Sequence, residues 1–174
     1  MGRKVKGTLE GTARLSGAII TPEQLAAGGS EHSHQCALFQ WIAIEGAGLL
    51  PSLHLLFAVP NGGDRRASVG AAMKAEGVKK GVPDLMLPVA AGRYYGLWIE
   101  MKKPGEERKK DGGASGEQLL WHRRLVGQGY AVCLCYSWEA ARWALWDYLL
   151  GEAGGMVMPL EGGARVIVAP PVVG

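Results

Sequence analysis

The sequence predicts an α/β domain in which a central mixed sheet is flanked by helices. Two observations predict it. Helical and strand-like segments follow one another in the order α-β-α-β-β-α-β-α, which favours helices packed on a sheet. The chain of 174 residues is also 48% hydrophobic and 20% charged, which is ordinary for a single domain with its own core.

The first convincing element is a helix over residues 31–45. Ser30 is in position to cap it, and an apolar stripe recurs with helical spacing in the residues that follow. Residues 1–29 precede it with a basic, glycine-rich start, and we expect them to form a flexible or weakly structured arm. Within that arm, Thr21-Pro22-Glu23-Gln24 has the pattern of a capping box and can begin one helical turn.

The next segment predicts a loop, a strand and a short helix. We expect residues 46–52 to form the loop and residues 53–59 the strand, because the turn sequence Pro60-Asn61-Gly62-Gly63 stops the apolar run. A short helix is then expected over residues 67–76, with Gly77 just past its end.

Two apolar runs, residues 82–89 and 94–102, are separated by a turn and predict a β-hairpin. After a charged loop, Ser115 and Gln118 form a capping box that opens a helix to about Gly127. A strand over residues 130–136 follows, and then a last helix over 138–150 that Ser137 is in position to cap. The tail, residues 152–174, contains one strand-like run at 164–169.

Composition excludes several classes of protein. The formal net charge is +3, which permits an anionic partner without requiring one. We expect no membrane span, because no apolar run approaches the roughly 18–20 residues that a bilayer needs. We also expect no secretory leader. Three cysteines (Cys36, Cys133 and Cys135) speak against a disulfide framework or a zinc site, and a cytosolic compartment is the default.

Two carboxylates are expected at one end of the hairpin. Asp84 begins the first strand and Glu100 lies near the end of the second, so the hairpin brings them to the same edge of the sheet. Lys102 shares a face with Glu100, because residues two apart on a strand point the same way. Two carboxylates suit a hard cation such as Mg²⁺, and a lysine beside them suits hydrolysis at phosphorus. The simpler interpretations are a turn residue at Asp84 and a salt bridge between Glu100 and Lys102.

The residues in and around this pair resemble a known family. Pro83-Asp84 followed by Glu100-Met101-Lys102 resembles the signature of the PD-(D/E)XK nuclease superfamily. The segment from Gly77 to Leu85, Gln118 with Trp121, and Gly129-Tyr130-Ala131-Val132 are similar to the VRR-NUC family within it. The likeness covers about Glu31 to Tyr148. It implies a restriction-endonuclease-like core of the order αβββαβ, with a nuclease domain over residues 30–151 and the helix at 67–76 as an insertion.

The resemblance also implies roles for single residues. Asp84 and Glu100 would bind Mg²⁺ or Mn²⁺, with the backbone carbonyl of Met101 completing the site. Lys102 would orient the water or stabilise the transition state. Glu31 would be an additional metal or water ligand, although an acid in the first turn of a helix is also favoured by the helix dipole alone.

Gln118 matches the glutamine that in this family holds the lysine or a phosphate, although it can also be only the partner of Ser115. The basic and polar residues expected to contact the nucleic acid are Asn61, Arg65, Lys79, Lys80 and Lys103. Asn61 can equally be only a turn residue. The histidines are left out of the site: His32 and His34 point to different faces, and His54 and His122 are isolated and expected to be structural or exposed to solvent.

The function implied is a Mg²⁺- or Mn²⁺-dependent, structure-specific DNA endonuclease. Stand-alone relatives act on branched DNA, and the implied substrate is a junction such as a Holliday junction, cut by a homodimer in the cytoplasm of a bacterium or phage-infected cell. Trp143 and Trp146 on the last helix are one possible dimer interface. Three alternatives stay open: a flap-directed or end-directed nuclease or a restriction-type enzyme with the same site, a non-catalytic DNA-binding module, and a partner-binding protein with a chance motif.

Overall fold

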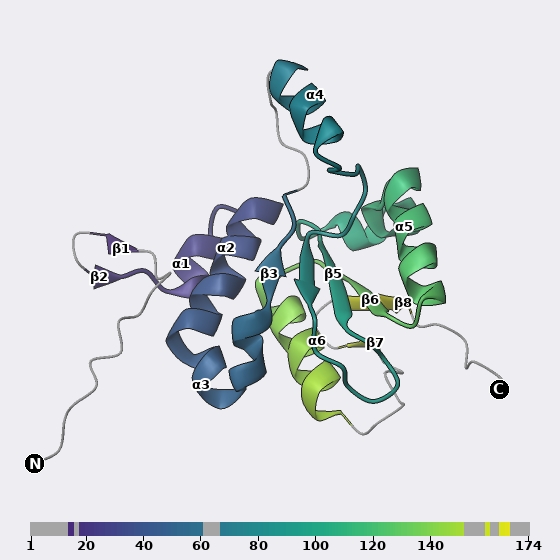
Figure 1. The fold of residues 1–174 in the computed structure, drawn as a ribbon. Helices are drawn as coiled ribbons and strands as arrows, with labels where there is room; N and C mark the ends of the chain where they lie inside the picture. Colours follow the sequence, from purple (N-terminus) through teal and green to yellow (C-terminus); the bar gives the residue numbers. More distant parts are fainter. Residues whose placement is uncertain (1–13, 16–17, 61–66, 152–158, 161–163, 168–174) are drawn as a thin grey trace, which may run out of the picture.

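The fold is known from a computed structural model, which describes residues 14–15, 18–60, 67–151, 159–160 and 164–167. A mixed sheet lies at the centre (Figure 1). Its described strands stand in the order β3-β4-β5-β6-β8-β7. Their bounds are β3 (Phe57–Ala58), β4 (Leu85–Leu87), β5 (Leu97–Met101), β6 (Ala131–Cys135), β7 (Pro159–Leu160) and β8 (Ala164–Ile167). Two further short strands, β1 (Arg14–Leu15) and β2 (Ala18–Ile19), pair separately.

Among the described strands, one parallel pair stands between antiparallel pairs. β4 pairs with both β3 and β5 in antiparallel fashion, which confirms the predicted hairpin. β5 and β6 are parallel, and helix α5 (Gly116–Gly127) makes the crossover between them. β8 then adds to the free edge of β6 in antiparallel register, so part of the tail extends the sheet.

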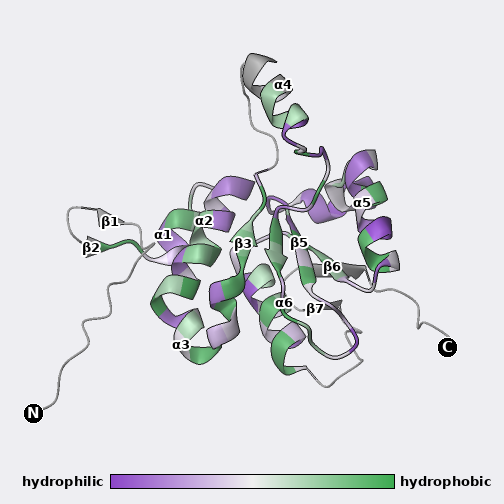
Figure 2. Ribbon diagram, in the orientation of Figure 1, coloured by the Kyte–Doolittle hydropathy of each residue, from purple (hydrophilic) through white to green (hydrophobic). Residues whose placement is uncertain are grey.

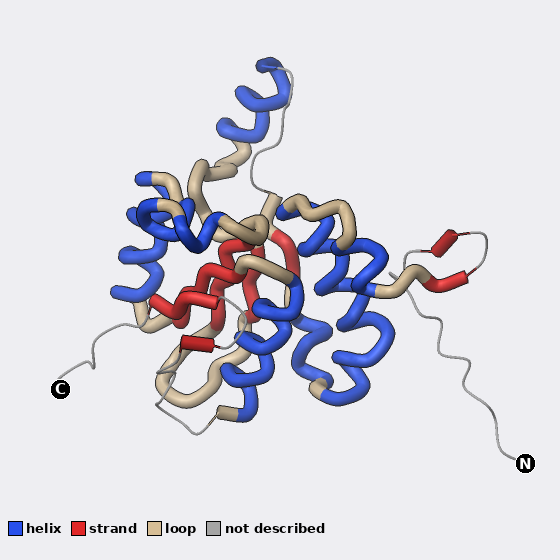
Figure 3. Tube along the Cα trace, turned by 180° about the vertical axis from the view of Figure 1, so that it is seen from behind, coloured by secondary structure: helices blue, strands red, loops and turns tan. Residues whose placement is uncertain are grey.

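Helices cover the sheet on both faces. Helices α2 (Glu31–Trp41) and α6 (Trp138–Leu150) pack on one face, and Figure 3, seen from behind, shows α6 in front of the strands. Helix α5 lies on the other side in Figure 1. The sequence α2-β3-β4-β5-α5-β6 therefore forms the predicted αβββαβ core, and α4 (Ala67–Ala75) is inserted between β3 and β4.

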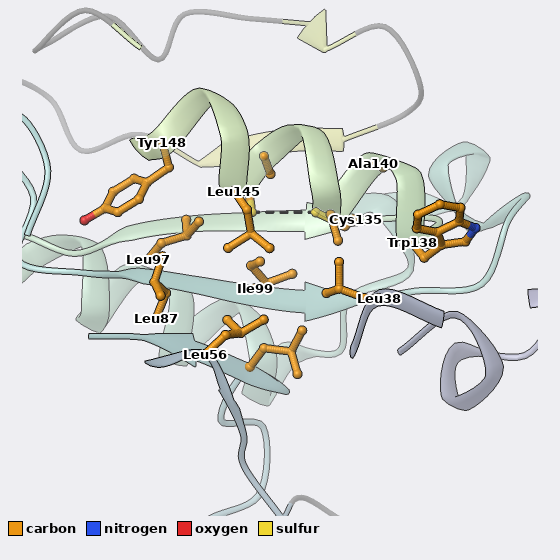
Figure 4. Packing of buried hydrophobic residues seen from close by; sticks show 14 of the residues in the cluster. Leu38, Leu56, Leu87, Leu97, Ile99, Cys135, Trp138, Ala140, Leu145 and Tyr148 are labelled. Carbon is orange, nitrogen blue, oxygen red and sulfur yellow. Dashed lines mark hydrogen bonds between the residues drawn. The ribbon is translucent and has the colours of Figure 1, made fainter. Parts of the chain in front are cut away.

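The hydrophobic core lies between the sheet and the pair α2–α6. Leu97, Ile99 and Met101 alternate along β5 and point into it, together with Leu38 of α2 and Leu145 of α6 (Figure 4). Cys133 and Cys135 are buried in β6, their sulfurs 3.7 Å apart, and pack there as small hydrophobic residues. The alternate residues of β5, Trp98 and Glu100, point to the opposite face.

Three helix caps form where the sequence places them. Ser30, Ser115 and Ser137 accept hydrogen bonds from the backbone at the starts of α2, α5 and α6. Thr21 and Gln24 form the predicted capping box of α1 (Pro22–Ala26). This short helix packs against α2, and Gln40 of α2 donates a hydrogen bond to the carbonyl of Ile20.

The prediction between residues 46 and 59 is wrong. The expected loop is helical: α2 continues as a π-helical stretch (Ile42–Gly46) and then as α3 (Ala47–Leu49). The expected strand over residues 53–59 is reduced to β3, because Pro51 begins a 3-10 helix (Pro51–Leu55) that consumes the first half of the apolar run. The charged loop after β5 also contains two 3-10 turns, Glu106–Arg108 and Lys110–Gly113.

Among the described residues, no helix has both the length and the hydrophobicity that a membrane span requires.

Candidate active site

The end of the β4–β5 hairpin brings the two predicted carboxylates together. Leu85 pairs with Ile99 in the antiparallel ladder, so Asp84 and Glu100 follow at the same sheet edge. Asp84 is held there by its own side chain, because its Oδ2 accepts a hydrogen bond from the backbone N–H of Met101 at 2.9 Å. In Figure 2, hydrophilic segments gather near this end of the sheet, between α2 and α5.

Glu100 is almost completely buried, with 1% of its side chain exposed. Its Oε1 lies 3.1 Å from the Nζ of Lys102 and accepts a hydrogen bond from the side-chain amide of Gln118. Both partners had been singled out from the sequence, and both contact the same carboxylate oxygen. A buried carboxylate needs such partners, because an isolated charge in this environment would be very costly.

The ammonium of Lys102 faces several acceptors at once. Its Nζ donates to Oε1 of Gln118 at 3.2 Å and lies 3.8 Å from Oε1 of Glu31. Burial by itself would lower the pKa of Lys102, but the carboxylates of Glu100, Glu31 and Asp84 together raise it above its ordinary value. Lys102 is therefore protonated at neutral pH.

Asp84 carries the most perturbed carboxyl group of the site. Burial, and then the charge of Glu100, raise its pKa from 3.8 to about 7, although the hydrogen bond from Met101 acts in the opposite direction. Two neighbouring carboxylates disfavour each other's ionisation unless a cation lies between them. This is the electrostatic condition in which a divalent cation binds favourably.

Glu31 reaches the site from the first turn of α2. Its side chain is half exposed, and burial raises its pKa while the charge of Lys102 lowers it. The helix thus supplies a third carboxylate near Lys102, from an element far away in the sequence. The polar cap at Ser30 fixes where this helix begins, and so where Glu31 projects.

Gln118 makes the contacts expected from both interpretations that the sequence left open. Its side-chain Oε1 accepts from the backbone N–H of Ser115 at 2.8 Å, which closes the capping box of α5. The same side chain contacts Lys102 and Glu100. The start of α5 is thereby tied to the end of β5 through one glutamine.

The loop that leads to Asp84, residues 77–83, packs against α5 and is hydrogen-bonded to it. The indole of Trp121 donates a hydrogen bond to the carbonyl of Lys80 at 3.0 Å, and Lys80 forms an exposed ion pair with Glu117. Gly81 has a φ of +83° and lies so close to Glu117 that a Cβ would approach within 2.8 Å. Lys79 and Lys80 are exposed on this loop and precede Asp84 in the chain.

Of the three remaining candidates, the structure describes Lys103 and does not describe Asn61 or Arg65. Lys103 is exposed directly after Lys102, where its charge is felt by Glu31. Glu106, which the sequence analysis did not select, also acts electrostatically on Glu31, and it accepts a hydrogen bond from Lys109 at 2.6 Å. Asn61 and Arg65 lie outside the described residues.

Comparison with known proteins agrees with this geometry. The VRR-NUC domain family matches residues 32–139, which is more than half of the chain. The chain belongs to the VRR-NUC family. A solved structure described as a VRR_NUC domain protein is similar at 25% sequence identity and a TM-score of 0.55, over 68% of this chain and 87% of that one. No curated protein matches.

A VRR-NUC domain implies a nuclease, and a nuclease implies binding of DNA. The matched span includes Asp84, Glu100, Lys102 and Gln118, while Glu31 lies one residue before its start. The position of Glu31 beside Lys102 therefore rests on the structure and not on the match.

The sequence analysis did not place His122 near Glu100. It was expected to be structural or exposed to solvent, and it is buried, with its Nε2 3.9 Å from Oε2 of Glu100. The available signal was its spacing: His122 follows Gln118 by four residues on one helix, and such residues share a face. His34, in contrast, is structural, since its Nδ1 accepts a hydrogen bond from the backbone N–H of Trp138 that begins α6.

Proposed function

We propose that this VRR-NUC protein is a Mg²⁺- or Mn²⁺-dependent endonuclease that hydrolyses phosphodiester bonds in branched DNA, such as Holliday junctions. The observation that carries the proposal is the convergence of Asp84, Glu100 and Lys102 at one end of the β4–β5 hairpin. The proposal includes action as a homodimer in the cytoplasm of a bacterium or phage-infected cell.

The residues present fit a hard divalent cation. Asp84 and Glu100 offer carboxylate oxygens, which Mg²⁺ and Mn²⁺ prefer, and the carbonyl of Met101 and the carboxylate of Glu31 are further oxygen donors nearby. Among the described residues no three carboxylate, histidine or cysteine side chains already form a complete metal cluster. Mg²⁺ is commonly held by one or two carboxylates together with water and substrate phosphate, so Asp84 and Glu100 are enough carboxylates for it. When bound, the cation supplies Lewis-acid activation of the phosphate and of a water molecule.

Lys102 contributes positive charge to the reaction. Its raised pKa keeps the ammonium protonated, so it can donate to a phosphate oxygen or to a water but cannot remove a proton from one. Of the two roles that the family resemblance implies, this favours stabilisation of the charge that develops on the phosphate. Gln118 holds the ammonium by accepting from it, and Glu31 provides a second carboxylate toward the same group.

The exposed lysines around the site supply contacts to the DNA backbone. Lys79 and Lys80 precede Asp84, and Lys103 follows Lys102, so positive charge flanks the carboxylates along the chain on both sides. We assign the same role to Asn61 and Arg65 of the Asn-Gly turn. Such contacts position the duplex without reading its sequence, which agrees with recognition of DNA shape.

A homodimer would provide two sites for two strands, as symmetric cutting of a junction requires. Trp143 of α6 has 49% of its surface exposed, which is unusual for a tryptophan and suits an interface; Trp146 is packed against the core. The proposed dimer is accordingly built on α6.

The test is cleavage of a labelled synthetic four-way junction, with a flap and a linear duplex as controls. The reactions are run in Mg²⁺, in Mn²⁺ and in EDTA, with Asp84→Ala and Lys102→Ala beside the wild type. We expect symmetric, metal-dependent cutting of the junction, abolished by both substitutions. Sedimentation of the same samples measures whether the active species is a dimer.

Other outcomes decide between the remaining functions. Cutting of the flap, the DNA end or the linear duplex in preference to the junction would retain the site and replace the substrate. Salt-sensitive binding of DNA with no cutting in either metal would replace the enzyme with a DNA-binding module. Absence of both binding and cutting at moderate salt would contradict the proposal as a whole.

A further inference from the structure

His122 and Glu100 face one another in the layer between β5 and α5. The distance from Nε2 of His122 to Oε2 of Glu100 is 3.9 Å, and each side chain is 1% exposed. Both ring nitrogens of His122 and the Oε2 of Glu100 are buried atoms without a hydrogen-bond partner. Three such atoms therefore belong to one pair of residues.

The unpaired atoms of His122 and Glu100 are chemically complementary. A buried polar atom without a partner is costly, and native structures contain few of them. An imidazole N–H and a carboxylate oxygen are complementary, and an approach of roughly 1 Å, or one bridging water, would satisfy both. Oε2 of Glu100 and Nε2 of His122 are thus each the partner that the other lacks.

The two oxygens of Glu100 have different neighbours. Oε1 faces Lys102 and Gln118, and Oε2 faces His122. Gln118 and His122 lie on one face of α5, so a single helix supplies a neighbour to each oxygen of the carboxylate. Rotation of the carboxylate is then restricted from both sides.

We infer that His122 is a positioning residue of the nuclease site: its Nε2–H donates to Oε2 of Glu100, directly or through a water, and fixes the carboxylate for the cation. The inference rests on the proposed function, because it assigns Glu100 to the metal. His122 acts through Glu100 and does not itself touch the cation or the DNA. Hydrogen-bond partners of metal-binding carboxylates commonly contribute about 10- to 100-fold to metal affinity.

The test compares Mn²⁺ binding to the full chain without DNA, measured by calorimetry. His122→Leu keeps an apolar volume but removes the donor, and His122→Gln returns an N–H near the position of Nε2. Leu125→Ala is the matched control, because Leu125 is buried one turn further along α5, so its truncation weakens the packing of the same helix. Thermal unfolding of each variant in EDTA measures the structural cost separately.

We expect the Kd for Mn²⁺ to rise about 10- to 100-fold in His122→Leu. In His122→Gln we expect the Kd for Mn²⁺ to return to within a few-fold of the wild-type value. In Leu125→Ala we expect the Kd to stay unchanged, although the Tm falls. A long-range ¹H–¹⁵N spectrum of the metal-free protein should show the proton of His122 on Nε2, with a shift that changes in Glu100→Gln.

Two results would overturn the inference, and they are distinguishable. If the wild type binds Mn²⁺ and His122→Leu binds it equally well, His122 is only a packing residue and the proposed nuclease is unaffected. If the wild type and Glu100→Gln both fail to bind Mn²⁺, the metal-dependent function is wrong and the role of His122 is lost with it. A proton on Nδ1 alone, with Nε2 unprotonated, would also overturn it.

Discussion

The ammonium of Lys102 and the carboxylate of Glu100 lie 3.1 Å apart, with 7% and 1% of their side chains exposed. Each group is therefore the main charge compensation of the other in a region with little access to water. Loss of one member of a buried pair is strongly destabilising, typically by about 3–5 kcal/mol, because the other charge remains buried. The pair thus couples the stability of the metal-free protein to the residues proposed for catalysis.

Lys102→Met tests this coupling. We expect DNA cleavage to fall by about 10²- to 10³-fold, as when one group that stabilises transition-state charge is removed. The free energy of unfolding in EDTA should fall by several kcal/mol. A bound cation would compensate Glu100 in place of the lysine, so Mn²⁺ should raise the Tm of Lys102→Met more than that of the wild type. Thermal unfolding with and without Mn²⁺ measures this difference.

Lys80→Met is the matched control for that experiment. Lys80 also pairs with a glutamate at 3.1 Å, but the side chains of Lys80 and Glu117 are 84% and 52% exposed. An exposed pair contributes little to stability, so the Tm should hardly change with or without Mn²⁺. Equal losses of stability in both lysine variants would contradict the importance of burial at Lys102.

The pKa of Asp84 predicts how stability depends on pH in the absence of metal. Burial and the charge of Glu100 raise it to about 7, from an ordinary value of 3.8. Between these values the folded state binds more protons than the unfolded state, so the stability contributed by this carboxyl is complete below about pH 4 and lost as the pH rises through 7. The expected decrease in the free energy of unfolding between pH 5 and pH 8 is roughly 2–3 kcal/mol.

Urea unfolding in EDTA across this pH range, compared with Asp84→Asn, measures the contribution. The difference between the two proteins isolates Asp84, since burial lowers the pKa of His34 and this gives the opposite slope in the same range. We expect Asp84→Asn to be the more stable protein at pH 8, and its advantage to be smaller by roughly 2–3 kcal/mol at pH 5. A difference that does not change with pH would show that Asp84 titrates normally.

The sequence predicted the parts of this fold that depend on local chemistry. The caps at Ser30, Ser115 and Ser137 are local patterns, and each begins its helix where expected. The β4–β5 hairpin follows from two apolar runs around a turn, and the hairpin by itself brings Asp84 to Glu100.

The parts that it did not predict depend on contacts between distant residues. The apolar run after Pro51 has no period that separates a strand from a 3-10 helix, and only β4 decides which two residues pair as β3. The burial of His122 depends on α5 lying over β5, which makes its i+4 spacing from Gln118 significant only after the crossover is known. In the same way, the sequence could not show that Gln118 serves a cap and the site together.

Gln118 and Ser115 allow the cap and the site to be separated experimentally. Ser115→Ala removes the hydroxyl that accepts from the backbone of Gln118 but leaves the contacts of Gln118 with Lys102 and Glu100. It should cost about 1 kcal/mol of stability with cleavage nearly unchanged. Gln118→Ala should lose similar stability at the helix end and, in addition, lower kcat by at least about tenfold, because Lys102 and Glu100 lose a shared partner.

Cleavage rates and urea unfolding of the two variants, at equal concentrations of folded protein, make the comparison. Equal kcat values in Ser115→Ala and Gln118→Ala would mean that the glutamine acts only as part of the cap.

Gly81 tests whether the loop before Asp84 must lie against α5. Its φ of +83° already disfavours any side chain, and a Cβ would come within 2.8 Å of Glu117 and 3.0 Å of the backbone nitrogen of Gln118. Gly77, at the other end of the same loop, has a φ of +97° with no atom within 4 Å of the corresponding Cβ. A side chain at either glycine would therefore strain the backbone, but only a side chain at Gly81 would also clash with α5.

Gly77→Ala should lose about 1–2 kcal/mol of stability through backbone strain and keep its kcat. Gly81→Ala should lose more stability, and its kcat should fall by about 10- to 100-fold, because the loop must move from α5 and takes Asp84 with it, and a displacement near 1 Å is enough for such a loss. Urea unfolding and junction cleavage of both variants distinguish strain from displacement. If Gly81→Ala cleaves as fast as Gly77→Ala, the contact with α5 does not position Asp84, and the hydrogen bond from Met101 alone must hold this carboxylate in the site.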